Sequence, residues 1–338
     1  MKKIFVRSPY SITIDEAGQI GSRVELFIWN ANVSEPTEPT YTMSKRIVSE
    51  TQTENVYNIS NKCVEFINEK NPIYTSIPAT ESFKNWCFAK VKRYKETSAN
   101  VYVLIDEETF VCFDGYTSFL AGANQFDNSE CVALFNQDIK KYVKNFNSIY
   151  VNVFLGVGNY DVDNGSIVET FIVSEPKLYK IPISSNNIFV NKDGIGNLYL
   201  IKSEEICEAK YTPIVCSFIN RFGGWEFLTF FKANQKSIDV KSSTFNLMPE
   251  SWDYDTFIGS NKQFNFNGTR KIVCNTGWVD ENYSELIQDL LVSQVVLLDN
   301  IPVLCKSTSS EEKTQLKDKN INYTINFEYN FNLLNDVI

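Results

Sequence analysis

The sequence predicts a mainly β protein with β-sandwich-like domains, a few short helices and an α+β C-terminal domain. Short segments that alternate apolar and polar residues recur along the chain, and turn residues separate them about every ten positions, as in β-sandwiches. Near the C-terminus every second residue from 321 to 331 is apolar, and only a strand places such residues on one face. These residues are Ile321, Tyr323, Ile325, Phe327, Tyr329 and Phe331.

The chain has 338 residues, of which 43% are hydrophobic and 22% charged, an ordinary composition for a folded protein. This length exceeds what one hydrophobic core usually serves, so more than one domain is expected. We expect an N-terminal β-sandwich-like domain over residues 1–130 and a β-hairpin or connecting region over 131–178. A C-terminal β-rich domain over 179–338 should contain one helix at 282–294 and a long closing strand at 321–331.

The first third of the chain predicts several strands and one short helix. Residues 8–30 should form two strands around a turn at 17–19, because apolar and polar residues alternate on both sides of it. Ser60 or Asn61 should cap a short helix that contains Val64, since a side-chain oxygen can accept the first free N–H groups of a helix. Further strands are expected at 40–48, 86–94, 101–105 and 109–113.

In the remainder, residues 136–146 fit either an amphipathic helix or the lead-in to a strand at 149–155. Asp163-Asn164-Gly165 predicts a two-residue hairpin turn of type I′, because Asn-Gly tolerates positive φ angles. Asp280 should cap the helix at 282–294, whose leucines share one face. Another hairpin is expected at 188–200, and strands are expected at 212–219, 226–232, 237–240, 295–298 and 302–305.

Charge and residue usage restrict the chemistry that the chain can perform. The formal net charge is −9, which disfavours a surface that holds phosphate backbones or anionic lipid, although DNA could pass without being held. The chain has no His, which removes the usual general base and the commonest metal ligand. Its eight cysteines include no C-x-x-C pair, so we expect reduced, mostly buried thiols and neither a metal nor a cofactor.

The N-terminus begins like a signal peptide, but Arg7, Ser8 and Pro9 interrupt its apolar stretch. No window approaches the roughly 18 apolar residues of a membrane span. We therefore expect a chain made in the cytosol, with no membrane partner.

One segment resembles the start of a calcium loop. Asn159, Asp161 and Asp163 have the spacing of its first ligands, but Gly165 falls one position late and Thr170 stands where the bidentate acid belongs. A plain hairpin turn therefore explains this segment better than a metal site does.

Two further features could serve carbohydrate chemistry. Asp253 and Asp255 pair carboxylates with aromatic residues, as sugar-active sites do, although an exposed polar loop explains them equally well. A glycan-binding platform would need exposed aromatic rings, for which Trp225 and Trp252 are the first candidates. We expect no catalytic residues and a protein that is not an enzyme.

Several short motifs along the chain belong together. Residues 274–293, CNTGWVDENYSELIQDLLVS, combine an N-T-G-x-[IV]-[DP]-E pattern, a helix and an L-L-x-S pattern. A closing I-x-Y-x-I-x-F strand follows at 321–327, and upstream lie FINRFGGWE at 218–226 and YNIS at 57–60. These motifs resemble tail proteins of phages that infect Bacteroidota, crAss-like phages among them.

The resemblance implies a structural protein of the virion tail, assembled in the cytoplasm of the host bacterium. Its subunits would close into a six- or twelvefold ring around the DNA channel between portal and tail tip. Other tail or portal proteins would be its partners, and phage DNA would be passing cargo. The motifs themselves describe a scaffold, in which Thr276-Gly277 would supply a turn before the helix.

The closing strand is the first candidate for a subunit interface, because a long aromatic strand with few charges aggregates if its edge stays free. Its six apolar residues would pair either inside a sheet or with another chain. The arm at 307–320, which contains Lys313 and Lys317, is the second element that could cross to a neighbouring subunit. A receptor- or glycan-binding tail module is the alternative function, followed by a carboxylate-based glycan hydrolase.

Overall fold

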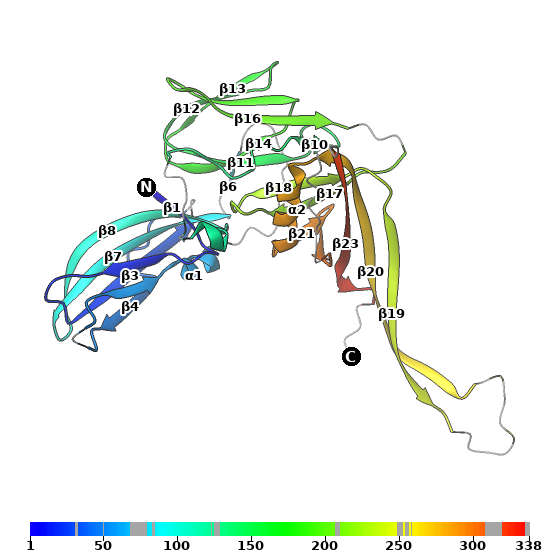
Figure 1. The fold of residues 1–338 in the computed structure, drawn as a ribbon, viewed down its shortest axis with the longest axis horizontal. Helices are drawn as coiled ribbons and strands as arrows, with labels where there is room; N and C mark the ends of the chain where they lie inside the picture. Colours follow the sequence, from blue (N-terminus) through cyan, green and yellow to red (C-terminus); the bar gives the residue numbers. More distant parts are fainter. Residues whose placement is uncertain are drawn as a thin grey trace. The chain divides into compact units, whose positions relative to one another are not determined.

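Strands dominate the computed structural model, and its helices are short, which confirms the predicted mainly β fold. The structure is shown in Figure 1. It describes residues 1–30, 33–49, 51–67, 80–82, 85–122, 124, 129–206, 210–248, 253, 257, 259–307 and 320–334, with 80–82 and 320 as backbone only.

The chain forms two compact units. Unit 1 comprises residues 1–207, 217–228 and 293–295, and unit 2 comprises 208–216, 229–292 and 296–338. Unit 1 thus continues through positions 130 and 178, where the sequence suggested boundaries. Strand β6 (Thr80–Ser82) pairs with β14 (Lys177–Pro182) across both positions. The division into three independently folding parts stays a prediction.

Unit 1 begins with a sandwich-like pair of sheets. A five-stranded sheet has the order β1-β8-β7-β3-β4, and β2 pairs with β5 in a second sheet. Alternate residues of both sheets face inward, so Ile12 and Tyr57 of the small sheet are buried with Val24 and Leu26 of the large one. The strands are β1 (Lys2–Phe5), β2 (Ser11–Ile14), β3 (Gly21–Asn30), β4 (Tyr41–Arg46), β5 (Asn55–Asn58), β7 (Trp86–Ser98) and β8 (Val101–Phe113).

The two strands expected on either side of the turn at 17–19 are confirmed as β2 and β3, although β2 pairs with β5 while β3 pairs with β4 and β7. Two other local predictions in this region are wrong. The two strands expected between 101 and 113 are a single strand, β8. Ser60 begins α1 (Ser60–Cys63) instead of capping it, because its hydroxyl donates to Asn58 Oδ1 at 2.8 Å. A 3₁₀ turn, η1 (Val64–Phe66), follows α1.

Two more sheets complete unit 1, with the strand orders β6-β14-β11-β9 and β10-β16-β15-β12-β13. Every residue of the central strand β11 is buried. Its Phe154 ring packs edge-on against Trp86 and Phe113 of the first sheet, with centroids 5.4 Å apart in both pairs. The strands are β9 (Val132–Ala133), β10 (Lys141–Val143), β11 (Tyr150–Leu155), β12 (Gly158–Asp163), β13 (Val168–Val173), β15 (Asn187–Lys192) and β16 (Gly196–Glu205).

The structure resolves the ambiguity at 136–146 in favour of a strand, because β10 lies parallel to β16 there. The hairpin around Asp163 is confirmed, since β12 and β13 pair antiparallel up to Asp163 and Val168. Its turn type is wrong, however, because the connection has four residues and Gly165 alone among them has a positive φ, +84°. The hairpin expected at 188–200 is confirmed as β15 and β16.

A seven-stranded sheet has the order β18-β17-β21-β22-β23-β20-β19. The predicted helix is confirmed as α2 (Tyr283–Val292), which buries Leu286, Ile287 and Leu290. The closing strand is confirmed as β23 (Asn320–Asn332). The other strands are β17 (Ile214–Ile219), β18 (Trp225–Phe230), β19 (Gln235–Asn246), β20 (Asn261–Asp280), β21 (Val296–Leu298) and β22 (Ile301–Cys305).

Strand β20 corrects one prediction about the motif at 274–282. Thr276-Gly277 does not end a strand, because β20 continues through it with a bulge at which Gly277 has a φ of +75°. Asp280 is the last residue of β20, where it pairs with Asn320, and α2 begins three residues later, so the cap expected at Asp280 stays a prediction. The chain therefore turns after Asp280, not before it.

The turn between β17 and β18 is fixed by the side chain of Asn220. Its Oδ1 accepts the backbone N–H groups of Phe222 and Gly224, both at 3.0 Å. Its Nδ2 donates to the Leu134 carbonyl at 2.8 Å and to Glu226 Oε2 at 3.3 Å. An amide side chain has no further capacity for hydrogen bonds. The F-I-N-R motif therefore ties the turn to a segment more than eighty residues earlier.

Glu226 also forms an ion pair with Lys141 of β10, and both side chains are almost wholly buried. Burial removes both charges from water, so each depends on the other for compensation. A second ion pair joins Glu204 to Lys140, the residue immediately before Lys141. This pair is partly exposed. The chain thus offers a buried and an exposed ion pair side by side in sequence.

Replacing Lys141 with Met should lower the free energy of unfolding by about 3–5 kcal/mol, because Glu226 would keep a buried charge without its partner. The matched change Lys140→Met should cost less than about 1 kcal/mol, since water screens the exposed pair. Urea denaturation of both variants measures the difference. Equal losses in the two variants would contradict the role assigned to the buried pair.

Candidate functional site

The face of β23 expected to meet another subunit is mostly covered by the chain itself. Ile321, Tyr323, Ile325 and Phe327 are buried, and the Phe327 ring packs edge-on against Phe230 at 5.8 Å. Strand β23 pairs with β20 along its length, so its apolar face forms part of the core of unit 2. This corrects the interface prediction for these four residues.

The outer end of β23 differs from its buried part. Tyr329 is half-buried, Phe331 is exposed, and their rings lie 5.6 Å apart. These two residues stay candidates for an interface. Lys313 and Lys317, the other two candidates, lie outside the described residues.

Two of the four residues considered for carbohydrate chemistry are described, and two lie outside the described residues. Trp225 is buried, with its backbone N–H donating to Asn152 Oδ1 at 2.9 Å, so it cannot form an exposed glycan platform. Asp253 is exposed, whereas Trp252 and Asp255 lie outside the described residues. Among the tryptophans that the structure describes, the exposed one is Trp278, with 69% of its surface accessible, opposite Asn322 on β23.

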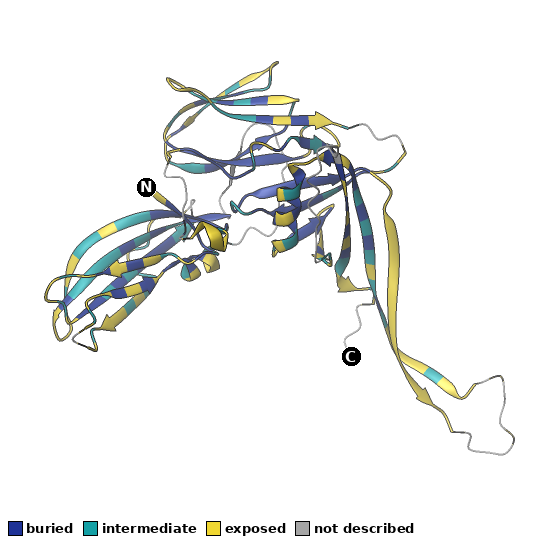
Figure 2. Cartoon of the chain, viewed as in Figure 1, coloured by how far each residue is buried: buried dark blue, intermediate teal, exposed yellow. Residues whose placement is uncertain are grey.

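The most exposed regular structure is the ribbon, which we define as β19 with residues 261–273 of β20. The two strands pair antiparallel from Gln235 opposite Val273 to Asn246 opposite Asn261. Over residues 261–268, β20 has no strand partner other than β19 among the described residues. Figure 2 shows that β19 is exposed along its whole length. A two-stranded element of this kind has little packing of its own.

The ribbon carries large apolar side chains on its exposed surface. Phe245 and Phe264 form an edge-on ring pair with centroids 5.6 Å apart. A shift in register after Lys241 coincides with a positive φ of 54° at Asn265, which marks a bulge. The exposed apolar residues of the ribbon and its end are Ile238, Val240, Phe245, Leu247, Met248, Phe264 and Phe266.

The charge of the ribbon is opposite to that of the whole chain. Among residues 235–246 and 261–271 there is a single acid, Asp239, which forms an exposed ion pair with Lys271. The full chain has a net charge of −9, so positive charge is concentrated on this element. The cations of the ribbon are Lys236, Lys241, Lys262, Arg270 and Lys271.

Sequence reasoning found only residues 237–240 of the ribbon. The alternation of Phe264 and Phe266 with polar neighbours was the signal that could have found its second strand. The strong polarity of the surrounding residues hides this alternation, because the chain buries neither Phe264 nor Phe266 and leaves β19 exposed along its length.

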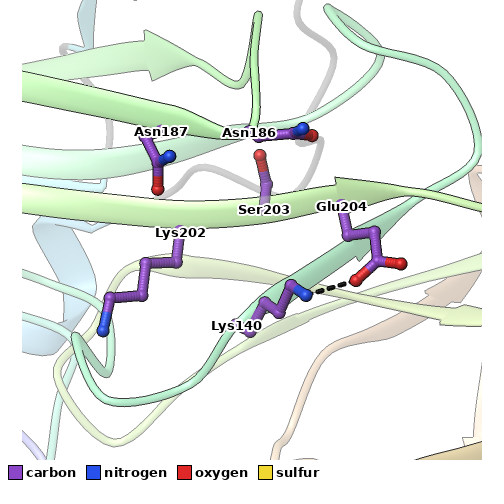
Figure 3. A pocket seen from close by; sticks show the side chains of 6 residues that line it. All are labelled: Lys140, Asn186, Asn187, Lys202, Ser203 and Glu204. Carbon is purple, nitrogen blue, oxygen red and sulfur yellow. Dashed lines mark hydrogen bonds and ion pairs between the residues drawn. The ribbon is translucent and has the colours of Figure 1, made fainter.

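A hollow with a volume of about 440 Å³ lies on unit 1 beside β16. It presents amines, amides and one carboxylate, and Figure 3 shows Lys140 directed toward Glu204 across it. Its one hydroxyl, that of Ser203, donates to the Ser185 carbonyl at 2.5 Å and is therefore already engaged. The lining residues are Lys140, Asn186, Asn187, Lys202, Ser203 and Glu204.

Seven of the eight cysteines are described, and all seven are free thiols. Six of them are buried, as expected from the sequence, and Cys305 is partly exposed. Hydrogen bonds with the Cys112 and Cys87 thiols hold the pKa of the Cys63 thiol below its usual range, whereas burial raises the pKa of Cys305. In the described part of the chain, no three His, Cys, Asp or Glu residues group as metal ligands.

No family model matches the chain, and no curated protein sequence does so. Among the helices described, none is both long and apolar enough to span a membrane.

Access, not acidity, should control the reaction of these thiols with iodoacetamide. In a Cys207→Ser variant we expect one thiol, Cys305, to react within minutes in the native state, while the buried ones react only after unfolding. Because the pKa of Cys305 is raised, its labelling rate should keep increasing with pH above the usual thiol range. Mass spectrometry of the labelled peptides identifies the site, and rapid labelling of Cys63 would contradict its burial.

Proposed function

We propose that this chain is a structural subunit of a phage tail, which assembles with copies of itself into a closed ring. The ribbon carries this proposal, because it presents large apolar side chains without cover from its own chain. Exposed apolar patches of this kind are typical of protein interaction sites. The motifs that resemble phage tail proteins support the same reading.

The ribbon is suited to protein contact for two physical reasons. An edge strand such as β19 has one row of free backbone N–H and C=O groups, to which another strand can add. An isolated two-stranded ribbon is only marginally stable in water, so contact with a partner would stabilise it. Both properties favour a ribbon that is completed in an assembly.

A ring requires contacts between two different surfaces of the same chain. Such heterologous contacts close when their rotation divides a full turn, and six or twelve subunits are the expected numbers. Portal or other tail proteins would bind the two sides of the ring, and phage DNA would pass through it. A receptor- or glycan-binding tail module stays the alternative, with Trp278 as its exposed aromatic residue.

Light scattering of the purified protein over a range of concentrations tests the ring. We expect a discrete closed oligomer of the wild-type chain. Replacing residues 242–266 with Asn-Gly should leave a folded chain that self-associates more weakly, because the exposed phenylalanines are lost while a two-residue turn closes the strand pair at Lys241 and Asn267. Circular dichroism checks that the shortened chain keeps its strands.

The control is Trp278→Ser, which removes an exposed aromatic residue outside the ribbon and should leave the mass of the oligomer unchanged. A wild-type protein that stays monomeric at all concentrations would contradict a self-closing ring. Glycan binding lost in the Trp278→Ser variant would favour the alternative function.

A further inference from the structure

The free edges of the sheets differ in how well they are protected against strand addition. Lysine and arginine on an edge strand discourage pairing with another strand unless that strand brings acidic side chains near them. Strand β1 carries the exposed Lys2, and β4 carries Lys45 and Arg46. Strand β13, with the sequence VETFIV, is the last strand of its sheet and has neither a basic residue nor a proline.

Strand β13 also presents an apolar outer surface. Val168 and Ile172 lie on one face by the alternation of the strand and are 58% and 74% exposed. On the neighbouring strand β12, Asp163 is opposite Val168 and Asp161 is opposite Thr170. Because opposed residues share a face, this edge combines two β-branched side chains with two carboxylates.

The β19 edge of the ribbon has the complementary arrangement. Ile238 and Val240 share one face and are 55% and 64% exposed. Lys236 lies on the same face two residues earlier, and Arg270 is opposite Ile238 on β20. Neither cation has an ion-pair partner among the described residues. This edge therefore combines two β-branched side chains with two cations.

We propose that the β19 edge of one copy adds to the β13 edge of a second copy and continues its sheet. This inference rests on the proposed self-assembly and identifies the two surfaces that meet. Backbone hydrogen bonds between the strands would hold the contact, as in other strand additions. Burial of the β-branched residues would add to its stability, and the opposite charges would set which edges meet.

The contact is heterologous, because each copy contributes β19 to one neighbour and β13 to the other. Two β19 edges repel each other through Lys236 and Lys241, and pairing of two β13 edges would bring together the aspartates of the neighbouring β12 strands. Pairing of unlike edges is thus favoured over pairing of like edges, which is what a ring of identical subunits requires.

Cross-linking of two full-length variants tests which surfaces meet. One variant carries Ile172→Cys and the other Ile238→Cys, both in a background with Cys207→Ser and Cys305→Ser. A short, flexible bis-maleimide should link a mixture of the two variants into covalent dimers, whereas neither variant alone should form them. The buried cysteines provide no background, because the chain covers them.

Each other outcome overturns the inference in a distinguishable way. Dimers formed by Ile238→Cys alone would show that ribbons pair with each other. A wild-type oligomer without cross-links in the mixture would reject the β13 edge and leave the proposed ring intact. A monomeric protein whose binding to duplex DNA, measured by fluorescence anisotropy, is lost in Lys236→Glu would identify the ribbon as a nucleic-acid arm instead.

Charge exchange gives a second, independent test. Lys236→Glu and Asp161→Lys should each weaken self-association about tenfold, because each places like charges on the two edges. The double variant should recover most of the lost affinity, since it restores an opposite pair. Lys202→Glu makes the same charge change at an exposed position of β16 and should have no effect on self-association. Absence of recovery in the double variant would contradict the pairing of these edges.

Discussion

The hydrogen-bonded side chain of Asn220 is the interaction on which the arrangement of unit 1 depends. It closes the turn between β17 and β18 and, with the same amide, binds the Leu134 carbonyl and Glu226. Glu226 in turn holds the charge of Lys141 inside the core. At Gly223, a Cβ atom would lie 2.7 Å from the backbone nitrogen of Asp114, so the turn also needs glycine for its close approach. Strands from residues 132, 141 and 225 onward are thereby fixed to one another by a few saturated polar groups.

The sequence predicted the fold class and most single strands, because alternation of apolar and polar residues depends only on local geometry. Strand β23 and helix α2 illustrate this, since each has one face that the chain buries. Pairing could not be predicted in the same way. Strands β2 and β3 adjoin in sequence but lie in different sheets, because the inward face of β2 is completed by Tyr57 on β5. The identity of the neighbours is a property of tertiary packing, which local patterns do not contain.

The candidate interface shows the same limit more sharply. A long aromatic strand predicts that something covers it, and the structure shows that the covering element for Ile321 to Phe327 is the chain itself. The ribbon has the reverse character: its polar residues and scattered phenylalanines form no strong pattern, yet it leaves apolar surface open to solvent. Amphipathic patterns find elements that are completed within one chain. An element that packs against another molecule has to match a surface of that molecule, and its own sequence contains no information about that surface.

The distribution of charge explains how a protein with so many strands can limit its own association. Cations on β1 and β4 discourage strands of another copy from adding to those edges. The net charge of −9 causes a general repulsion between copies. Against this background a cationic ribbon is attracted to the acidic parts of another copy. Strand β13 is an edge where aspartates accompany exposed β-branched residues without a protecting lysine. Electrostatics would therefore select the contact, and apolar burial with backbone pairing would hold it. Since the two surfaces differ, the proposed association would continue from copy to copy until its geometry closes a ring.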